Sequence, residues 1–227
     1  MSAKTHRLQF PLSEADARRL RAGDQVLLDG DIVITAGLPT HERMVQCLDS
    51  HTPLPMDLHE ASVFHLGSYS REVAGGLEVL YINPTTSTRF NPFMPRLIRH
   101  FNWHAVGGKG GLDQASAQAM QEAGCVYLSF LGGGCTLLSQ AVQSVLQVGW
   151  SDLLVHYRLV RLRVQGLGPA RRLEIHNLAE AVEQLDADIV CLQEVRKVHR
   201  RQERYFKGWP ALPQAEFLAP EGYAAVY

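Results

Sequence analysis

Residues 81–89 read Tyr81-Ile82-Asn83-Pro84-Thr85-Thr86-Ser87-Thr88-Arg89, which combines a strand, a turn and a group of polar side chains. The apolar strand leads to Pro84, which fixes the backbone of the turn, and four hydroxyl residues then precede Arg89. Hydroxyls and loop N–H groups at the end of a strand suit an anionic ligand, and an arginine can bind a carboxylate through two parallel hydrogen bonds. The alternative is an ordinary Ser/Thr-rich turn that caps the next helix.

Twenty residues after Arg89 lies Lys109, inside the glycine-rich run at residues 107–111. Glycines allow the backbone to approach a ligand closely, and the lysine adds a positive point charge. A Walker A phosphate loop is disfavoured, because Gly110 follows the lysine and Trp103 occupies the place of the first glycine. A flexible surface turn is the alternative.

His41 is a third candidate, because it stands near the start of a predicted helix and an imidazole can orient a neighbour or move a proton near neutral pH. The alternative is that it caps or packs the helix. The remaining histidines show no spacing typical of metal ligands, and Cys47, Cys125, Cys135 and Cys191 are too far apart for a zinc or redox pair. The sequence therefore predicts no metal site.

The composition excludes several classes of partner. The chain has 227 residues and a formal net charge of −1, so bulk charge gives no reason to expect binding to nucleic acid or to an anionic membrane. It has no apolar run of 18 residues or more and no secretory signal at its start. We expect a cytoplasmic protein with reduced cysteines.

Short strands mixed with helices predict an α/β domain over about residues 10–167. The pair Asp29-Gly30 between two apolar runs predicts a hairpin with a type I′ turn. Ser13, Thr40 and Asp113 have the side chains of helix caps. The predicted helices are residues 13–21, 40–48, 95–101 and 113–122, and the predicted strands are residues 62–66, 77–82, 125–130 and 159–164.

A boundary is predicted at residues 166–169, which read Gly-Leu-Gly-Pro. Beyond it we expect an amphipathic helix over residues 171–185, an apolar strand over residues 189–192 and a basic run over residues 196–204. Residues 170–227 contain too few elements to bury a core of their own, so they are interpreted as a short, incomplete α/β tail.

The motifs of residues 12–168 occur together, in the same order, in one family. Residues 20–30 match Leu-x-x-Gly-Asp-x-Val-x-Leu-x-Gly, residues 83–90 are similar to Gly-Pro-Thr-Thr-x-x-Arg-Met, and residues 108–110 form the Gly-Lys-Gly loop. The region resembles the beta subunit, or C-terminal domain, of the class I iron–sulfur hydro-lyases, which include class I fumarase and L-tartrate dehydratase.

This resemblance implies that residues 10–168 form a swivelling β/β/α domain of the class I fumarase C-terminal type. Such enzymes add or remove water at a 2-hydroxy dicarboxylate, with a [4Fe–4S] cluster acting as Lewis acid on the hydroxyl. The cluster cysteines belong to an alpha partner, so this chain would bind no cluster itself.

The resemblance also assigns the site residues. Thr85 matches the threonine proposed to transfer the proton, and Arg89 and Lys109 match the residues that hold the substrate carboxylates. Lys109 counts with Thr85 as a catalytic residue, and Thr86 and His41 complete the predicted substrate-binding set. A threonine hydroxyl acts as a base only when its surroundings activate it strongly.

One departure concerns the family motif Arg-Asp-x-x-His, whose arginine contacts substrate. Gly37 and Leu38 stand at its first two positions, and the histidine is His41. Asn83 replaces glycine and Phe90 replaces methionine in the motif at residues 83–90. These changes favour a hydroxy acid other than the family default fumarate, or a loss of activity that would leave a non-catalytic carboxylate-binding or assembly module.

Residues 187–195 resemble an early part of the endonuclease/exonuclease/phosphatase family, in which the glutamate at the position of Glu194 binds Mg²⁺. A single carboxylate makes a poor Mg²⁺ site, because the ion needs further oxygen ligands. A Mg²⁺-dependent phosphodiesterase or nuclease fragment is therefore the alternative function. We interpret the tail as a truncated remnant of such a domain, joined by a disruption of the reading frame.

Overall fold

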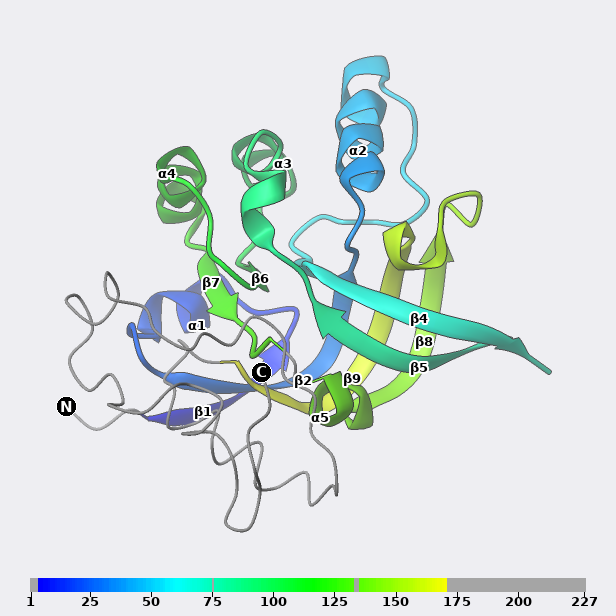
Figure 1. Cartoon of the computed structure of the whole chain (residues 1–227). Helices are drawn as coiled ribbons and strands as arrows, with labels where there is room; N and C mark the ends of the chain where they lie inside the picture. The colour runs from blue at the N-terminus through cyan, green and yellow to red at the C-terminus, as the bar shows by residue number, and fades with distance from the viewer. Residues whose placement is uncertain (1–3, 75, 133–134, 171–227) are drawn as a thin grey trace, which may run out of the picture. The chain divides into compact units, whose positions relative to one another are not determined.

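A mixed β-sheet forms the centre of the computed structural model, which describes residues 4–74, 76–132 and 135–170 (Figure 1). Its strands are β1 (Thr5–Phe10), β2 (Gln25–Ile34), β3 (Ser62–Phe64), β6 (Ala105–Gly108), β7 (Val126–Ser129), β8 (Val142–Gly149) and β9 (Leu159–Ala170). Within the described residues they lie in the order β7-β6-β3-β2-β9-β8, and β1 pairs with β2. The mixture of this sheet with helices confirms the predicted α/β class.

Within the sheet, β2, β3, β6 and β7 run in one direction. β2 pairs in parallel with β1 along its first half and with β3 at its end, and β3, β6 and β7 continue the parallel pairing. On its other side β2 pairs antiparallel with β9, which in turn pairs antiparallel with β8. The carboxyl ends of β2, β3, β6 and β7 therefore meet at one edge of the sheet, where loops of α/β proteins bind ligands.

The remaining elements cover the two faces of the sheet. The helices are α1 (Glu14–Arg19), α2 (Leu38–Ser50), α3 (Met94–Phe101), α4 (Gln114–Ala123) and α5 (Cys135–Gln140), with 3₁₀ turns η1 (Ser87–Phe90) and η2 (Val155–Tyr157). The strands β4 (Leu66–Val73) and β5 (Gly76–Pro84) pair antiparallel as a separate two-stranded ribbon.

Alternation along the strands divides the core into two clusters, because successive side chains point to opposite faces. Val33 of β2 packs in one cluster with Met44 of α2 and Leu97 of α3. Its neighbour Ile32 packs in the other cluster with Ile82 of β5, together with residues of α1 and α5. The sheet thus lies between a helical layer of α2, α3 and α4, visible together in Figure 1, and a layer that contains the β4–β5 ribbon.

The predicted hairpin at Asp29-Gly30 is wrong, because β2 continues through both residues as one strand. Gly30 has a φ of +107° and is paired with Phe10 of β1, and two register shifts in the β2–β9 ladder precede it, on either side of Leu28. The Asp29 carboxylate accepts hydrogen bonds from the Arg7 side chain and from the Gly166 N–H. Because β2 pairs with both β1 and β9 here, these residues form an irregular part of the strand instead of the expected turn.

The other predicted elements are largely confirmed. The helices at residues 13–21, 95–101 and 113–122 are α1, α3 and α4, with Ser13 and Asp113 capping α1 and α4 through their side-chain oxygens. The predicted capping role of Thr40 is wrong, because α2 begins at Leu38, after Gly37, and the Thr40 hydroxyl donates to the Tyr157 carbonyl instead. β1, β4, β6, β8 and α5 were not predicted from the sequence, and the first two glycines of the run at residues 107–111 lie in β6 instead of a loop.

The predictions for the tail lie outside the described residues. They comprise the helix at residues 171–185, the strand at 189–192, the basic run at 196–204 and Glu194. The predicted boundary at residues 166–169 falls within β9, which continues to Ala170. Among the helices of the described residues, none combines the length and apolar character needed to cross a membrane.

Candidate functional site

The loops that follow β5 and β6 meet at the carboxyl edge of the parallel strands. Thr85 follows β5 directly, and its N–H donates to the carbonyl of His65, the residue after β3, at 2.8 Å. Lys109 follows β6, and its N–H donates to the Thr85 carbonyl at 2.9 Å. The Ser87 N–H donates back to the Lys109 carbonyl at 2.8 Å. These bonds bring the two loops that the sequence singled out into one cluster.

Gly108 shows how closely these loops approach each other. A Cβ atom added at Gly108 would lie 2.4 Å from the Ser87 Oγ and 3.0 Å from the Thr85 carbonyl oxygen. The Phe130 N–H, from the loop after β7, donates to the Gly108 carbonyl at 2.9 Å. Any side chain at position 108 would therefore push the two candidate loops apart.

Four of the five predicted site residues lie together at this edge. Thr85, Thr86 and Lys109 are half-buried, Arg89 is exposed, and Thr86 forms a parallel bridge with Lys109. The Arg89 guanidinium donates from Nη2 to the Thr85 Oγ1, and its Cζ lies 5.5 Å from the centre of the Phe90 ring. The cationic group thus stands directly beside the threonine hydroxyl.

The electrostatics of this edge favour an anion. Within the described residues, neither Arg89 nor Lys109 forms an ion pair with a carboxylate, although other arginines do so on the rest of the surface. Two cationic side chains without carboxylate partners, next to two threonine hydroxyls, can bind a ligand that carries carboxylate groups.

The fifth predicted residue, His41, does not lie at the open edge. It is completely buried in α2, where its Nδ1 lies 2.7 Å from the Gly37 carbonyl oxygen and its ring stacks on Phe90 at 4.2 Å. Burial lowers the pKa of His41 to about 4, so the ring is neutral near pH 7. Its position beneath η1 suits a packing or positioning role better than contact with substrate.

Three polar residues beneath the loops, His65, Ser87 and Tyr127, were not assigned to the site from the sequence, although Ser87 belongs to the hydroxyl residues of the motif at residues 81–89. Ser87 is completely buried, and its Oγ lies 2.8 Å from the His65 Nδ1 and 2.8 Å from the Tyr127 hydroxyl. The Tyr127 oxygen also accepts from the Gly111 N–H at 3.2 Å. The predicted strand at residues 62–66 already contained His65, but only the tertiary structure places it against η1.

Gly37 occupies the position at which the resembling family has an arginine. A Cβ atom at this position would lie 2.1 Å from the Thr40 Oγ1 and 2.8 Å from the Tyr157 carbonyl oxygen. A side chain therefore cannot be added here without moving η2 or the start of α2. In this chain the space next to position 37 is therefore occupied by Thr40 and by the Tyr157 backbone, which leave no room for an arginine side chain.

The described residues do not fit an iron–sulfur cluster. Cys47, Cys125 and Cys135 are free and half-buried, and burial raises the pKa of the Cys125 thiol. Within residues 4–74, 76–132 and 135–170, no three His, Cys, Asp or Glu side chains gather where they could hold a metal ion. An iron–sulfur cluster would therefore have to be bound by residues outside this part of the chain.

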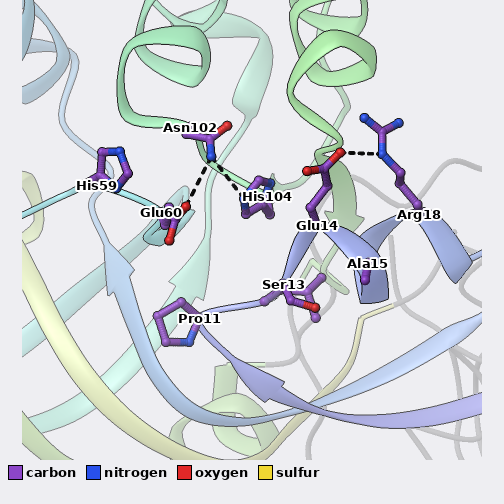
Figure 2. A pocket seen from close by; sticks show the side chains of 10 residues that line it. Pro11, Ser13, Glu14, Ala15, Arg18, His59, Glu60, Asn102 and His104 are labelled. Carbon is purple, nitrogen blue, oxygen red and sulfur yellow. Dashed lines mark hydrogen bonds and ion pairs between the residues drawn. The ribbon is translucent and has the colours of Figure 1, made fainter.

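Figure 2 shows a cavity of about 840 Å³ at the opposite end of the sheet. Its residues come from α1, its preceding loop and the loops that lead into β3 and β6, and they include none of the predicted site residues. Arg18 pairs with Glu14 at 2.7 Å, and the Asn102 amide donates to Glu60 at 3.4 Å. Two carboxylates and one paired cation make this cavity less suited to an anion than the carboxyl edge.

Comparison with known proteins agrees with the motifs at this edge. The family model described as "Fumarase C-terminus" matches residues 2–168. A putative L(+)-tartrate dehydratase subunit beta from Methanocaldococcus jannaschii is 34% identical over 159 residues, which cover 70% of this chain and 81% of that protein. The L(+)-tartrate dehydratase subunit beta of Escherichia coli (strain K12) is 28% identical over 162 residues, covering 71% of this chain and 79% of that protein.

A longer relative matches in the same region. The putative class I fumarate hydratase of Geobacillus stearothermophilus is 31% identical over 158 residues, which are 67% of this chain but only 30% of that protein. The resemblance to beta subunits of class I hydro-lyases is thus confirmed, and the chain belongs to the Fumarase C-terminus family.

Proposed function

We propose that this chain is the beta-type subunit of a hydro-lyase that adds water to, or removes it from, a 2-hydroxy dicarboxylic acid. The observation that carries the proposal is the cluster of Thr85, Arg89 and Lys109 at one edge of the sheet. A backbone hydrogen bond joins Lys109 to Thr85, and the Arg89 guanidinium donates to the Thr85 hydroxyl. The names of the relatives support the reaction, since they include tartrate dehydratase beta subunits and a fumarate hydratase.

In this proposal the two cations bind the two carboxylates of the substrate. Arg89 can form two parallel hydrogen bonds with one carboxylate, and Lys109 binds the other as a point charge. Thr86 lies beside Lys109 and offers a hydroxyl to the same ligand. A dicarboxylate thus neutralises both cations, neither of which pairs with a carboxylate within the described residues.

Thr85 transfers the proton at the carbon next to a carboxylate. Its hydroxyl accepts a hydrogen bond from the Arg89 guanidinium, and this positive charge favours negative charge on the threonine oxygen. Lys109 lies on the adjoining loop, and its backbone N–H donates to the Thr85 carbonyl. The environment therefore supplies part of the activation that a threonine needs to act as a base.

The iron–sulfur cluster belongs, in this proposal, to an alpha partner, where it would polarise the substrate hydroxyl. Residues 10–168 would act as the swivelling catalytic domain that brings the carboxyl edge onto the partner. The family match over residues 2–168 and the open position of Arg89 support this division.

The experiment is a set of substitutions in the complex of this chain with the alpha subunit. We expect Thr85→Ala to lower kcat about 10²- to 10⁴-fold, as loss of a proton-transfer group does. Lys109→Met should raise KM about 10- to 100-fold, because a charged hydrogen bond contributes about 1.5–3 kcal/mol.

Thr88→Ala is the matched control, because Thr88 is an exposed hydroxyl residue on the same turn. It should leave kcat and KM unchanged. Normal rates in Thr85→Ala together with Lys109→Met would remove the proposed site from the reaction.

A second candidate function is carboxylate binding without turnover, and the closed position at Gly37 favours it, since one anchor of the family is absent. Calorimetric titration of the complex with malate and tartrate distinguishes the two functions. Binding of either acid without dehydration by the same preparation would support the non-catalytic module, whereas turnover supports the hydro-lyase.

A further inference from the structure

Two neighbouring histidine rings lie completely buried beneath the loop that carries Thr85 and Arg89. The ring centres of His41 and His65 are 5.2 Å apart, and Phe90 contacts both rings, at 4.2 Å and 4.3 Å between centres. The Nε2 atoms of both histidines are buried and have no hydrogen-bond partner within the described residues. Buried polar atoms without partners are rare because each one costs free energy, so this pair calls for a physical explanation.

The protonation of His41 follows from its partner at Nδ1. This nitrogen lies 2.7 Å from the Gly37 carbonyl oxygen, and a carbonyl oxygen can only accept a hydrogen bond. The hydrogen of the neutral ring is therefore on Nδ1, which leaves the Nε2 of His41 as an acceptor.

The protonation of His65 follows from the other end of the cluster. The Gly111 N–H can only donate, and it donates to the Tyr127 oxygen; the Tyr127 hydroxyl donates in turn to the Ser87 Oγ. The Ser87 hydrogen then finds its acceptor at the His65 Nδ1, 2.8 Å away. In the neutral ring of His65 the hydrogen is consequently on Nε2, which is a donor.

The two atoms without partners are therefore complementary: a donor on His65 and an acceptor on His41. We propose that the His65 Nε2–H donates to the His41 Nε2, and that the resulting chain positions the candidate catalytic loops over α2. A ring separation of 5.2 Å allows this bond after a small rotation of either ring. The complete relay runs from the Gly111 N–H through Tyr127, Ser87, His65 and His41 to the Gly37 carbonyl.

The relay connects every loop of the candidate site. Ser87 lies in η1, between Thr85 and Arg89, and Gly111 lies two residues after Lys109. The His65 carbonyl accepts from the Thr85 N–H, so the same residue holds the loop through its backbone and through its ring. His41, His65 and Ser87 are thus positioning residues. This role rests on the proposed function, but the hydrogen bonds of the relay are independent of it.

The direct test is a long-range ¹H–¹⁵N correlation spectrum of the full chain labelled with [¹⁵N]histidine, at pH 7.5. This spectrum distinguishes the two neutral tautomers and the charged ring of each histidine. We expect His41 with its hydrogen on Nδ1 and His65 with its hydrogen on Nε2. The opposite tautomer at either residue, or a charged ring at either residue, would overturn the relay.

Two variants separate the relay from general packing. Ser87→Ala removes the donor to the His65 Nδ1, so the ring nitrogen resonances of both His65 and His41 should shift. Tyr127→Phe is the matched control, because the Ser87 hydroxyl can still donate to His65, and both tautomers should persist. Unchanged His65 resonances in Ser87→Ala would contradict the assigned hydrogen bond.

The positioning role is tested separately, in the complex with the alpha subunit. We expect Ser87→Ala to lower kcat/KM about tenfold or more, because small displacements of catalytic groups cost at least this much. Unchanged kinetics would overturn the positioning role. If the wild-type complex itself has no hydro-lyase activity, the proposed function fails, and the spectrum of the wild-type chain still decides the relay.

Discussion

At position 37 the backbone leaves no room for a side chain, because the Thr40 hydroxyl and the Tyr157 carbonyl lie within 2.1 Å and 2.8 Å of where a Cβ would stand. The sequence shows that Gly37 replaces the family arginine, but it does not show what surrounds the glycine. The structure adds that the surroundings of the residue have closed around the glycine. The absence of the arginine side chain thus agrees with the close approach of Thr40 and Tyr157 to this position.

We therefore expect Gly37→Ala to destabilise the protein by about 1–3 kcal/mol, as overpacking of a closed site does. Thermal unfolding and urea titration measure this change. Leu38→Ala is the control at the next position, because Leu38 is 41% exposed and its truncation should change stability by less than about 0.5 kcal/mol. Equal stabilities of Gly37→Ala and wild type would show that the site is open.

The buried histidines predict how stability depends on pH. Burial lowers the pKa of His41 to about 4 and that of His65 well below its usual value of 6.5, so in both cases the folded protein favours the neutral ring. Below pH 6.5 the unfolded chain binds more protons than the folded one, and stability falls as the pH falls from 6.5 towards 4.

The loss should reach about 1.4 kcal/mol per pH unit for each histidine, and it should vanish above pH 7. Urea unfolding at pH 7.5, 6.0 and 5.0 measures the slope. The control variant His59→Gln replaces an exposed histidine, and it should show the same slope of the free energy of unfolding against pH. Carboxylates such as Asp29, whose pKa the hydrogen bond from Arg7 lowers, contribute only at more acid pH. A free energy of unfolding that is constant between pH 7.5 and 5.0 would contradict the neutral buried pair.

At the scale of elements, the helices were predicted well because their signals are local. The caps Ser13 and Asp113 bond to backbone groups three residues away, so the sequence alone contains the interaction. The hairpin at Asp29-Gly30 failed because the competing contacts are distant: Arg7 and Gly166 lie 22 and 137 residues away from Asp29. Sheet pairing decided between two local structures that the same pair of residues allows.

Gly30→Asn distinguishes a strand from a turn at this position. Asparagine is well tolerated in a type I′ turn, but in β2 a Cβ at residue 30 would lie 2.3 Å from the Phe10 carbonyl oxygen. We expect a loss of more than about 2 kcal/mol in the free energy of unfolding, from overpacking and the disturbed pairing of β1. A variant as stable as wild type would support the hairpin instead.

In the candidate site, too, the residues with local sequence signals were predicted and those that depend on distant contacts were not. Thr85, Thr86, Arg89 and Lys109 were identified from two motifs, and the structure brings them together through three backbone hydrogen bonds at the carboxyl edge. His65, Ser87 and Tyr127 were not identified, because their importance arises from contacts between β3, η1 and β7. The motifs identified the side chains that the structure places together at the carboxyl edge, whereas the residues packed beneath them depend on the tertiary fold.

At the scale of the whole molecule, the described part of the chain combines the proposed substrate-binding groups with no cluster of side chains that could hold a metal ion. The cationic edge at Arg89 and Lys109 is built by the core of the sheet, while the described cysteines do not gather. In the proposed function the reaction is divided between two proteins: this chain would bind the carboxylates and move the proton, and the partner would supply the cluster.

Reconstitution tests this division most directly. The purified chain and the alpha subunit, each prepared alone and then mixed under anaerobic conditions, are assayed for dehydration of malate and tartrate by the absorbance of the product. We predict no turnover by either protein alone, turnover of a 2-hydroxy dicarboxylate by the mixture, and loss of that turnover when the chain carries Thr85→Ala. Turnover by the chain alone, or equal turnover by the mixture with Thr85→Ala, would contradict the account.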